Sequence, residues 1–204
     1  MSKPDHLRYA GATAEIQRAA LRDITRAAPI LMAALRDARQ MQLDQWWIVS
    51  GAIYNQVWNH LTGRPEMTGV KDIDLFYFDP DTSYEAEDRQ IKRAETVFAP
   101  HPPVELRNQA RVHLWYEKHF GTPCPPYHDT EEPIRNFASR THSVGLRLLP
   151  DDQLKIYAPY GLDDIFGFRV TPNALLANRA THEAKAARQK LIWPELTITP
   201  WPDT

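Results

Sequence analysis

Asp-Ile-Asp-Leu-Phe-Tyr-Phe, at residues 72–78, is rich in branched and aromatic side chains. Such a composition is typical of a β-strand, and the following Asp-Pro-Asp at residues 79–81 ends it. Side chains alternate between the two faces of a strand, so Asp72 and Asp74 share one face while Ile73 and Leu75 share the other. The stretch therefore predicts a strand with two adjacent carboxylates on one side.

Two carboxylates held side by side repel each other unless a cation lies between them. Mg²⁺ binds a few carboxylates together with substrate phosphates, so Asp72 and Asp74 are candidate metal ligands. The alternative is the solvated face of an edge strand. The aromatic residues 76–78 favour burial, and buried unpaired aspartates are rare.

Glu105 is the third candidate ligand, in the short predicted strand 104–107. It points away from Val104 and Leu106, which lets it join the two aspartates from a neighbouring strand. The alternative is an ion pair with Arg107. Three carboxylates can hold two metal ions about 3.5–4 Å apart, an arrangement that activates an attacking oxygen and stabilises a leaving one.

A second motif precedes the aspartates. Residues 46–50 (Trp-Trp-Ile-Val-Ser) are predicted as a buried strand, Gly51 as a turn, and residues 52–61 as a helix. A glycine lets a phosphate approach the backbone closely, and the free N–H groups of the following helix point at it. Ser50 and Gly51 are therefore candidate phosphate ligands, although a Ser-Gly pair before a helix is often only a turn. The segment at residues 63–69 is expected to loop out.

The remaining chain is rich in predicted helices. Helices are expected within residues 14–40, at 84–97 and at 110–120, a hairpin from strands 144–149 and 154–158, and a C-terminal helix at about 174–191 with Asn173 as its N-cap. This order indicates a single domain over residues 1–204 of the α+β or α/β class. The N-terminal helices (14–40) and the C-terminal helix are expected to pack on it.

Together, the glycine turn, the Asp-x-Asp strand and the later acidic strand resemble the polymerase-β-like nucleotidyltransferase superfamily. The chain is most similar to an uncharacterised bacterial nucleotidyltransferase-like family. The stretches that carry this similarity are 46–52 (WWIVSGA), 72–79 (DIDLFYFD), 107–113 (RNQARVH) and 158–164 (APYGLDD). The resemblance implies an α+β fold with a mixed sheet flanked by helices, the use of an NTP and Mg²⁺ (or Mn²⁺), and transfer of a nucleotidyl group.

Polar residues after the third strand are further candidates for substrate binding. Arg111 is a bidentate donor suited to a triphosphate, and Asn108 lies beside it. A structural hydrogen-bond or ion-pair network is the alternative for both. On the C-terminal helix, the basic residues form either a solvated face or a contact for RNA phosphates. They are Arg179, Lys185, Arg188 and Lys190.

The composition of the chain bears on its binding partners and on the compartment in which it acts. The net charge is −2 and the pI about 6.4, so no global basic field attracts nucleic acid. Cys124 is the only cysteine, which suits a reducing compartment. The polar N-terminal residues 1–10 lack the apolar core of a signal peptide, and the sequence has no apolar run long enough to span a membrane. We expect a cytoplasmic protein.

The sequence favours a Mg²⁺-dependent nucleotidyltransferase with Asp72, Asp74 and Glu105 as metal-binding and catalytic residues. The acceptor is open: RNA, protein or a small molecule. Two alternatives use the same residues. A catalytically silent nucleotide-binding or regulatory module needs no third acid, and a metal-dependent phosphohydrolase releases phosphate instead of pyrophosphate.

Overall fold

The computed structural model describes residues 4–98, 102–121 and 123–202. The strands of the main sheet are β1 (Trp47–Val49), β2 (Ile73–Tyr77), β3 (Val104–Asn108), β4 (Gly145–Leu148) and β5 (Leu154–Tyr157). Among the described residues they form one sheet in the order β3-β2-β1-β4-β5, with only β2 and β3 parallel. A separate parallel pair consists of β6 (Arg169–Val170) and β7 (Thr197–Ile198). The predicted α+β class with a mixed sheet is confirmed.

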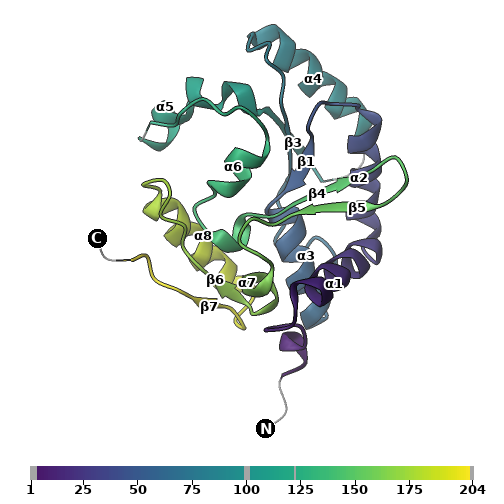
Figure 1. Cartoon of the computed structure of the whole chain (residues 1–204), viewed down its shortest axis with the longest axis vertical. Coiled ribbons are helices and arrows are strands. Elements are labelled where there is room, and N and C mark those ends of the chain that lie inside the picture. The colour runs from purple at the N-terminus through teal and green to yellow at the C-terminus, as the bar shows by residue number, and fades with distance from the viewer. Residues whose placement is uncertain (1–3, 99–101, 122, 203–204) are drawn as a thin grey trace.

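Helices cover both sides of this sheet (Figure 1). α1 and α2 lie on one side, and α5, α6 and α8 lie on the other. The α-helices are α1 (Ala14–Arg26), α2 (Pro29–Gln40), α3 (Gly51–Thr62), α4 (Tyr84–Val97), α5 (Tyr116–Phe120), α6 (Glu131–Arg135), α7 (Asp163–Phe166) and α8 (Arg179–Ile192). Short 3₁₀ helices are η1 (Asp5–Leu7), η2 (Gln109–Leu114) and η3 (Arg140–His142).

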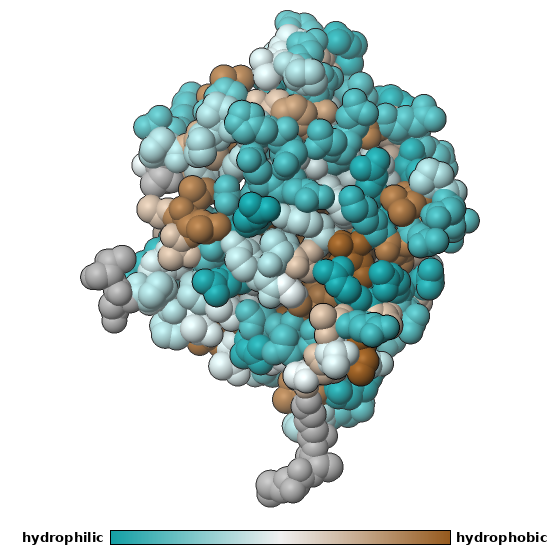
Figure 2. All heavy atoms as spheres, in the orientation of Figure 1, coloured by the Kyte–Doolittle hydropathy of each residue, from teal (hydrophilic) through white to brown (hydrophobic). Residues whose placement is uncertain are grey.

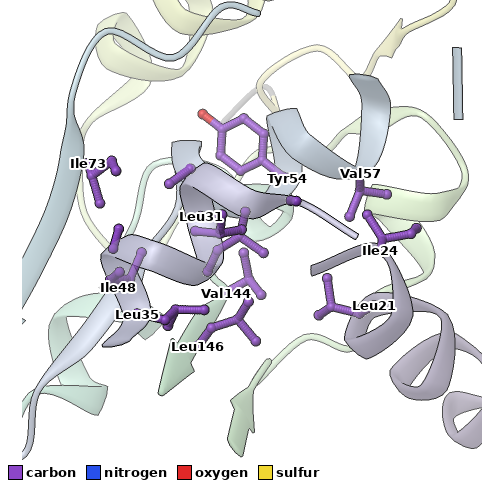
Figure 3. Packing of buried hydrophobic residues seen from close by; sticks show 14 of the residues in the cluster. Leu21, Ile24, Leu31, Leu35, Ile48, Tyr54, Val57, Ile73, Val144 and Leu146 are labelled. Atoms are coloured by element: carbon purple, nitrogen blue, oxygen red, sulfur yellow. The ribbon is translucent and has the colours of Figure 1, made fainter. Parts of the chain in front are cut away.

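The main core lies between the sheet and helices α1 to α3 (Figure 3). Ile48, Ile73 and Leu146 come from β1, β2 and β4, and all three are fully buried. Leu31 and Leu35 of α2 belong to the same buried cluster. Burial of such apolar surface is the main favourable term in folding. One face of the sheet is thereby fixed, and the other face carries a second, smaller apolar cluster together with the polar side chains.

The ends of these helices follow from residues with known capping roles. Thr13 caps α1 by accepting a hydrogen bond from the backbone N–H of Ile16, and Ser83 caps α4 by accepting one from Ala86. Pro29 starts α2, where its missing N–H costs nothing. Gly63 ends α3 in the left-handed conformation, φ +68°.

Two predicted helices differ from the observed ones. Residues 110–120 form the 3₁₀ helix η2 and then α5, because the Asn108 side chain accepts from the N–H of Ala110 and starts a tighter turn. The C-terminal helix begins at Arg179, not near residue 174. Asn173 does not cap it, because its side-chain amide donates to the carbonyls of Arg135 and Phe137.

The segment between α3 and β2 loops out as expected, and it packs closely on its neighbours. Its Glu66 side chain accepts from the N–H of Leu31 at the start of α2. The carbonyl of Thr68 accepts from the amide of Asn59, whose oxygen accepts from the indole N–H of Trp193. These contacts fix the loop that leads directly into Asp72.

The face shown in Figure 2 is mostly hydrophilic, with apolar side chains in a few separate patches. Scattered apolar residues of this kind are normal for a folded domain. Across the described part of the chain, no helix combines the length and the apolar character needed to span a membrane.

Gly69 gives a test of the loop packing. Its φ is +76°, and a Cβ atom there would overlap the Trp193 ring. Gly69→Ala should therefore lower the free energy of unfolding by about 1–2 kcal/mol for the backbone strain, and by about 1–3 kcal/mol more for the overpacking. Urea unfolding measures the change. Gly63→Ala is the matched control, because its φ is also positive but nothing lies within 4 Å of the added carbon. Equal losses in the two variants would contradict the packing.

Candidate functional site

The three acidic residues singled out from the sequence lie together at one edge of the β2–β3 pair. Asp74 and Glu105 are direct neighbours in the parallel register, and Asp72 immediately precedes β2. One carboxylate oxygen from each residue lies within 4.8 Å of the others. The structure therefore brings the three carboxylates together as the strand alternation predicts.

The burial of β2 explains why the aspartates face away from the core. Ile73, Leu75 and Tyr77 alternate along the strand and are all buried. Asp74 and Phe76 lie between them and are only partly buried, on the opposite face. Slipping the strand by one residue would bury the carboxylate among α2 and α3, so the apolar pattern fixes the site.

Glu105 takes part in both arrangements considered from the sequence. It belongs to the carboxylate cluster, and its Oε1 also accepts from Nη2 of Arg107 at 2.8 Å and from Nε at 3.1 Å. The two side chains are 44% and 41% exposed, so the ion pair adds little stability. The pair orients Glu105, and both contacts use the same carboxylate oxygen.

The electrostatic environment of Asp74 favours a proton or a cation. Burial, together with repulsion from Asp72 and Glu105, raises the pKa of Asp74 to about 7. Lys185 acts in the opposite direction. The folded protein thus holds this carboxylate in a place where its negative charge is poorly solvated without a counterion.

These donors suit a hard divalent cation. All three are carboxylates, the ligand type that Mg²⁺ and Mn²⁺ prefer, and their oxygens lie within reach of a common ion. A metal also relieves the repulsion that raises the pKa of Asp74. The residues present therefore fit the ion that the sequence resemblance implies.

A cleft divides into two parts at the carboxylates. The first part, here called the basic lobe, has a volume of about 240 Å³. Its lining includes Ser50 and Gly51 at the start of α3, together with Asp72. Three basic residues complete it: Lys71, Lys185 and Arg188. Cations beside carboxylates and a helix N-terminus are the features that bind a metal-bound polyphosphate.

Gly51 has no structural need to be a glycine. Its φ is not positive, and an added Cβ would make only ordinary contacts, 3.7 Å from Nδ2 of Asn55 and 3.8 Å from the Tyr54 hydroxyl. The strained residue is its neighbour Ser50, which is buried with φ 57° and ψ −115°. The missing side chain at Gly51 thus leaves room in the basic lobe itself.

The second part, here called the aromatic lobe, has a volume of about 200 Å³. It shares Asp74, Glu105 and Lys185 with the basic lobe. Most of its lining is apolar, with rings contributed by β2, by α5 and the residue before it, and by the segments around α6. These are Phe76, Trp115, Tyr116, Phe120, Tyr127 and Phe137.

Asn108 and Arg111, interpreted from the sequence as phosphate ligands, line neither lobe. Asn108 is buried and joins the ends of β2 and β3, because its Nδ2 donates to the carbonyl of Asp79. The Arg111 side chain donates to the carbonyl of Thr82 and pairs with Glu87 at 3.0 Å. Structural contacts thus use both side chains, as the alternative from the sequence allowed.

The basic residues of the cleft come from elsewhere. Lys185 and Arg188 belong to the helix interpreted from sequence as a solvated face or an RNA contact, and they line the basic lobe. They are three residues apart, so they share one helix face. This spacing, next to buried positions of the same helix, is the feature of the sequence that could have identified them as site residues. Lys71, which directly precedes Asp72, is not among the site residues that the sequence predicts.

Buried hydrogen bonds hold α8 against α3 and the segment around η3. Gln189 donates to the Tyr54 hydroxyl at 2.8 Å and also contacts the ring of His142. His182, one turn before Lys185, contacts the Ser139 hydroxyl at 2.7 Å. Burial lowers the pKa of His142 well below its usual value, so this ring stays neutral. The contacts fix the side of α8 that carries Lys185 toward the carboxylates.

Comparison with known proteins supports this arrangement. A solved NMR structure described as revealing a CCA-adding enzyme head domain superposes with a TM-score of 0.74. It is 28% identical in sequence, over 89% of this chain and 95% of that one. No curated protein matches the chain significantly. The Nucleotidyltransferase family matches residues 36–198, most of the chain, and the protein therefore belongs to that family.

Proposed function

We propose that the protein transfers a nucleotidyl group from an NTP to a hydroxyl acceptor with the help of Mg²⁺ or Mn²⁺. One observation carries the proposal: Asp72, Asp74 and Glu105 converge within 4.8 Å at the junction of the two lobes. A basic lobe on one side of a metal-binding cluster provides for the phosphates of the NTP. The other lobe leaves a place for further substrate groups.

The phosphates are assigned to the basic lobe. Lys71, Lys185 and Arg188 offset their charge, and the space left at Gly51 allows the chain to approach them. The first N–H groups of a helix have no partner within that helix. The start of α3 is therefore a suitable place for a phosphate oxygen.

The reaction is a displacement at the α-phosphorus. The acceptor oxygen forms a bond to that phosphorus, the bond to the bridging oxygen breaks, and pyrophosphate leaves with the electron pair. Glu105 takes the hydroxyl proton, and the carboxylates of Asp72, Asp74 and Glu105 would hold the metal. A bound ion supplies charge neutralisation for the attacking and leaving oxygens. Lys185 lies beside the carboxylates and stabilises negative charge that develops on the phosphates.

The acceptor and the cellular setting belong to the same proposal. RNA, a protein or a small molecule can each present a hydroxyl, and the name of the similar solved structure favours considering RNA. We place the protein in the cytoplasm, where NTP and Mg²⁺ are present and the lone, buried Cys124 stays reduced.

Incubation with an NTP labelled on its α-phosphate tests the proposal. With Mg²⁺ or Mn²⁺, and with pools of RNA, protein or small molecules, label should move to an acceptor and pyrophosphate should appear. Water can replace the acceptor and give slow release of NMP and pyrophosphate. Release of orthophosphate alone indicates a phosphohydrolase, and metal-dependent NTP binding without any turnover indicates a silent module. Either result contradicts nucleotidyl transfer.

In the same assay, two variants distinguish a residue that lines the cleft from one that only supports the fold. Lys185→Ala should weaken NTP binding and turnover at least tenfold with little change in melting temperature, because Lys185 lines both lobes. Arg111→Ala should instead lower the melting temperature, because it leaves the largely buried Glu87 unpaired. Its turnover per folded molecule should stay near that of the unaltered protein. The reverse pattern would place the phosphates near Arg111.

The affinity for metal should depend on pH through Asp74. Its pKa is raised to about 7, so below pH 7 the metal-free folded protein keeps a proton that Mg²⁺ must displace. In the unfolded chain the same carboxyl loses its proton near pH 4, so stability without metal falls as pH rises from about 4 to 7. Mg²⁺ should bind about tenfold more weakly at pH 6 than at pH 8.

Calorimetric titration of Mg²⁺ in two buffers with different ionisation enthalpies measures this effect. Close to one proton should be released per binding event at pH 6, and close to none at pH 8. Asp74→Glu, which retains a carboxylate at the site, is a suitable comparison. Equal affinity and no proton release at both pH values would contradict metal binding by Asp74.

A further inference from the structure

The aromatic lobe contains more ring surface than phosphate binding requires. Phe76 and Phe137 lie 5.8 Å apart between ring centroids, and Tyr116 and Phe120 lie 4.6 Å apart. Trp115 completes the rim and is 36% exposed. A cavity of about 200 Å³ lined by such rings suits one planar ring system, because flat rings pack well on aromatic side chains.

The position of this lobe relative to the phosphates indicates which substrate enters it. Gly51 and Asp72 line only the basic lobe, whereas Asp74 and Glu105 line both. In a displacement at phosphorus, the attacking and leaving oxygens lie roughly in line. Pyrophosphate that leaves into the basic lobe therefore requires an attacking oxygen from the opposite side. That side is the aromatic lobe, next to the Glu105 carboxylate.

The lining also indicates the chemistry of the entering group. Besides the rings it presents the neutral amides of Gln109, Asn136 and Asn178. Amide groups both donate and accept hydrogen bonds, which suits the edge of a heteroaromatic ring. The charged lining residues are the carboxylates of the cluster and the basic residues next to them. Away from these, apolar walls with a few amides favour an uncharged group, because a charge would lose its hydration there.

The aromatic lobe has few of the features that bind a polynucleotide. Its affinity for proteins comes largely from cations that contact successive phosphates. Among the lining residues that the structure describes, the lysines and arginines are Arg107 and Lys185. Arg107 already pairs with Glu105, and Lys185 is shared with the phosphates of the basic lobe.

We propose that the aromatic lobe binds the acceptor, and that this acceptor is a small neutral molecule whose reactive hydroxyl is attached near an aromatic or heteroaromatic ring. The ring packs against Phe76, Phe137 and Trp115, and the hydroxyl reaches Glu105. The inference rests on the proposed nucleotidyl transfer and specifies the substrate class for the same site.

Saturation-transfer NMR tests the proposal on the full chain loaded with α,β-methylene-ATP and Mg²⁺. The ring-bearing probes are adenosine and 2-phenylethanol, ribose is the non-aromatic control, and the RNA hexamer r(A)₆ is the polynucleotide. At least one ring-bearing probe should bind through its ring protons without displacing the nucleotide, and ribose should not bind. Trp115→Ala should weaken this binding about tenfold, the usual scale for one lost stacking partner.

Matched variants test whether binding of the probes depends on the aromatic lobe. Tyr84→Ala removes a more accessible ring on α4, 67% exposed and outside the lobe, and should leave probe binding unchanged. Phe120→Ala removes a second ring of the lobe and should repeat the loss, which guards against misfolding of one variant. The Mg²⁺-dependent thermal shift with α,β-methylene-ATP should be the same in all three variants.

Three results would overturn the inference. Competition between adenosine and the nucleotide assigns the lobe to the base of the NTP. Salt-sensitive binding of r(A)₆ that is tighter than adenosine assigns it to RNA, and binding of neither aromatic probe removes the ring site. Failure of the parent proposal looks different: α,β-methylene-ATP then gives no Mg²⁺-dependent shift, while ring binding is still measurable in EDTA without nucleotide.

Discussion

Repulsion among three carboxylates within 4.8 Å is the constraint on which the rest of this structure depends. The fold tolerates it because β2 is fixed from the opposite face, where Ile73 and Leu75 are completely buried. The parallel register with β3 then places Glu105 beside Asp74. The free energy that keeps these charges together therefore comes from the apolar core and the sheet, not from contacts among the charges themselves.

The site also requires basic side chains that face the carboxylates, and α8 supplies them. Gln189, Tyr54 and His142 form a buried polar group whose hydrogen bonds would be lost if the helix turned. Directly after α8, the Trp193 indole donates to Asn59, which in turn holds the loop that leads to Asp72. The same packed elements thus separate a basic lobe from an aromatic one. A metal-dependent transferase can use this separation to keep its leaving group and its acceptor on opposite sides.

Local patterns predicted the part of the site that lies on adjacent strands. Alternation along residues 72–78 placed the two aspartates on one face, and the same rule placed Glu105 on the neighbouring strand. Contacts between segments that lie far apart in the sequence could not be predicted in this way. Lys185 reaches the carboxylates only because α8 folds back over the sheet, and Arg111 is drawn away by Glu87. The aromatic lobe likewise joins segments that no short spacing relates.

The central claim, that Asp74 acts through its charge as a metal ligand, is tested most directly by the melting temperature of Asp74→Asn in EDTA at pH 8. Its pKa is about 7, so at pH 8 the carboxylate is charged in a place that disfavours the charge. Asparagine keeps the shape and removes the charge, so the melting temperature should stay equal or rise while nucleotidyl transfer is lost. A clear fall in melting temperature with transfer retained would contradict the account, because Asp74 would then be a structural partner of a cation.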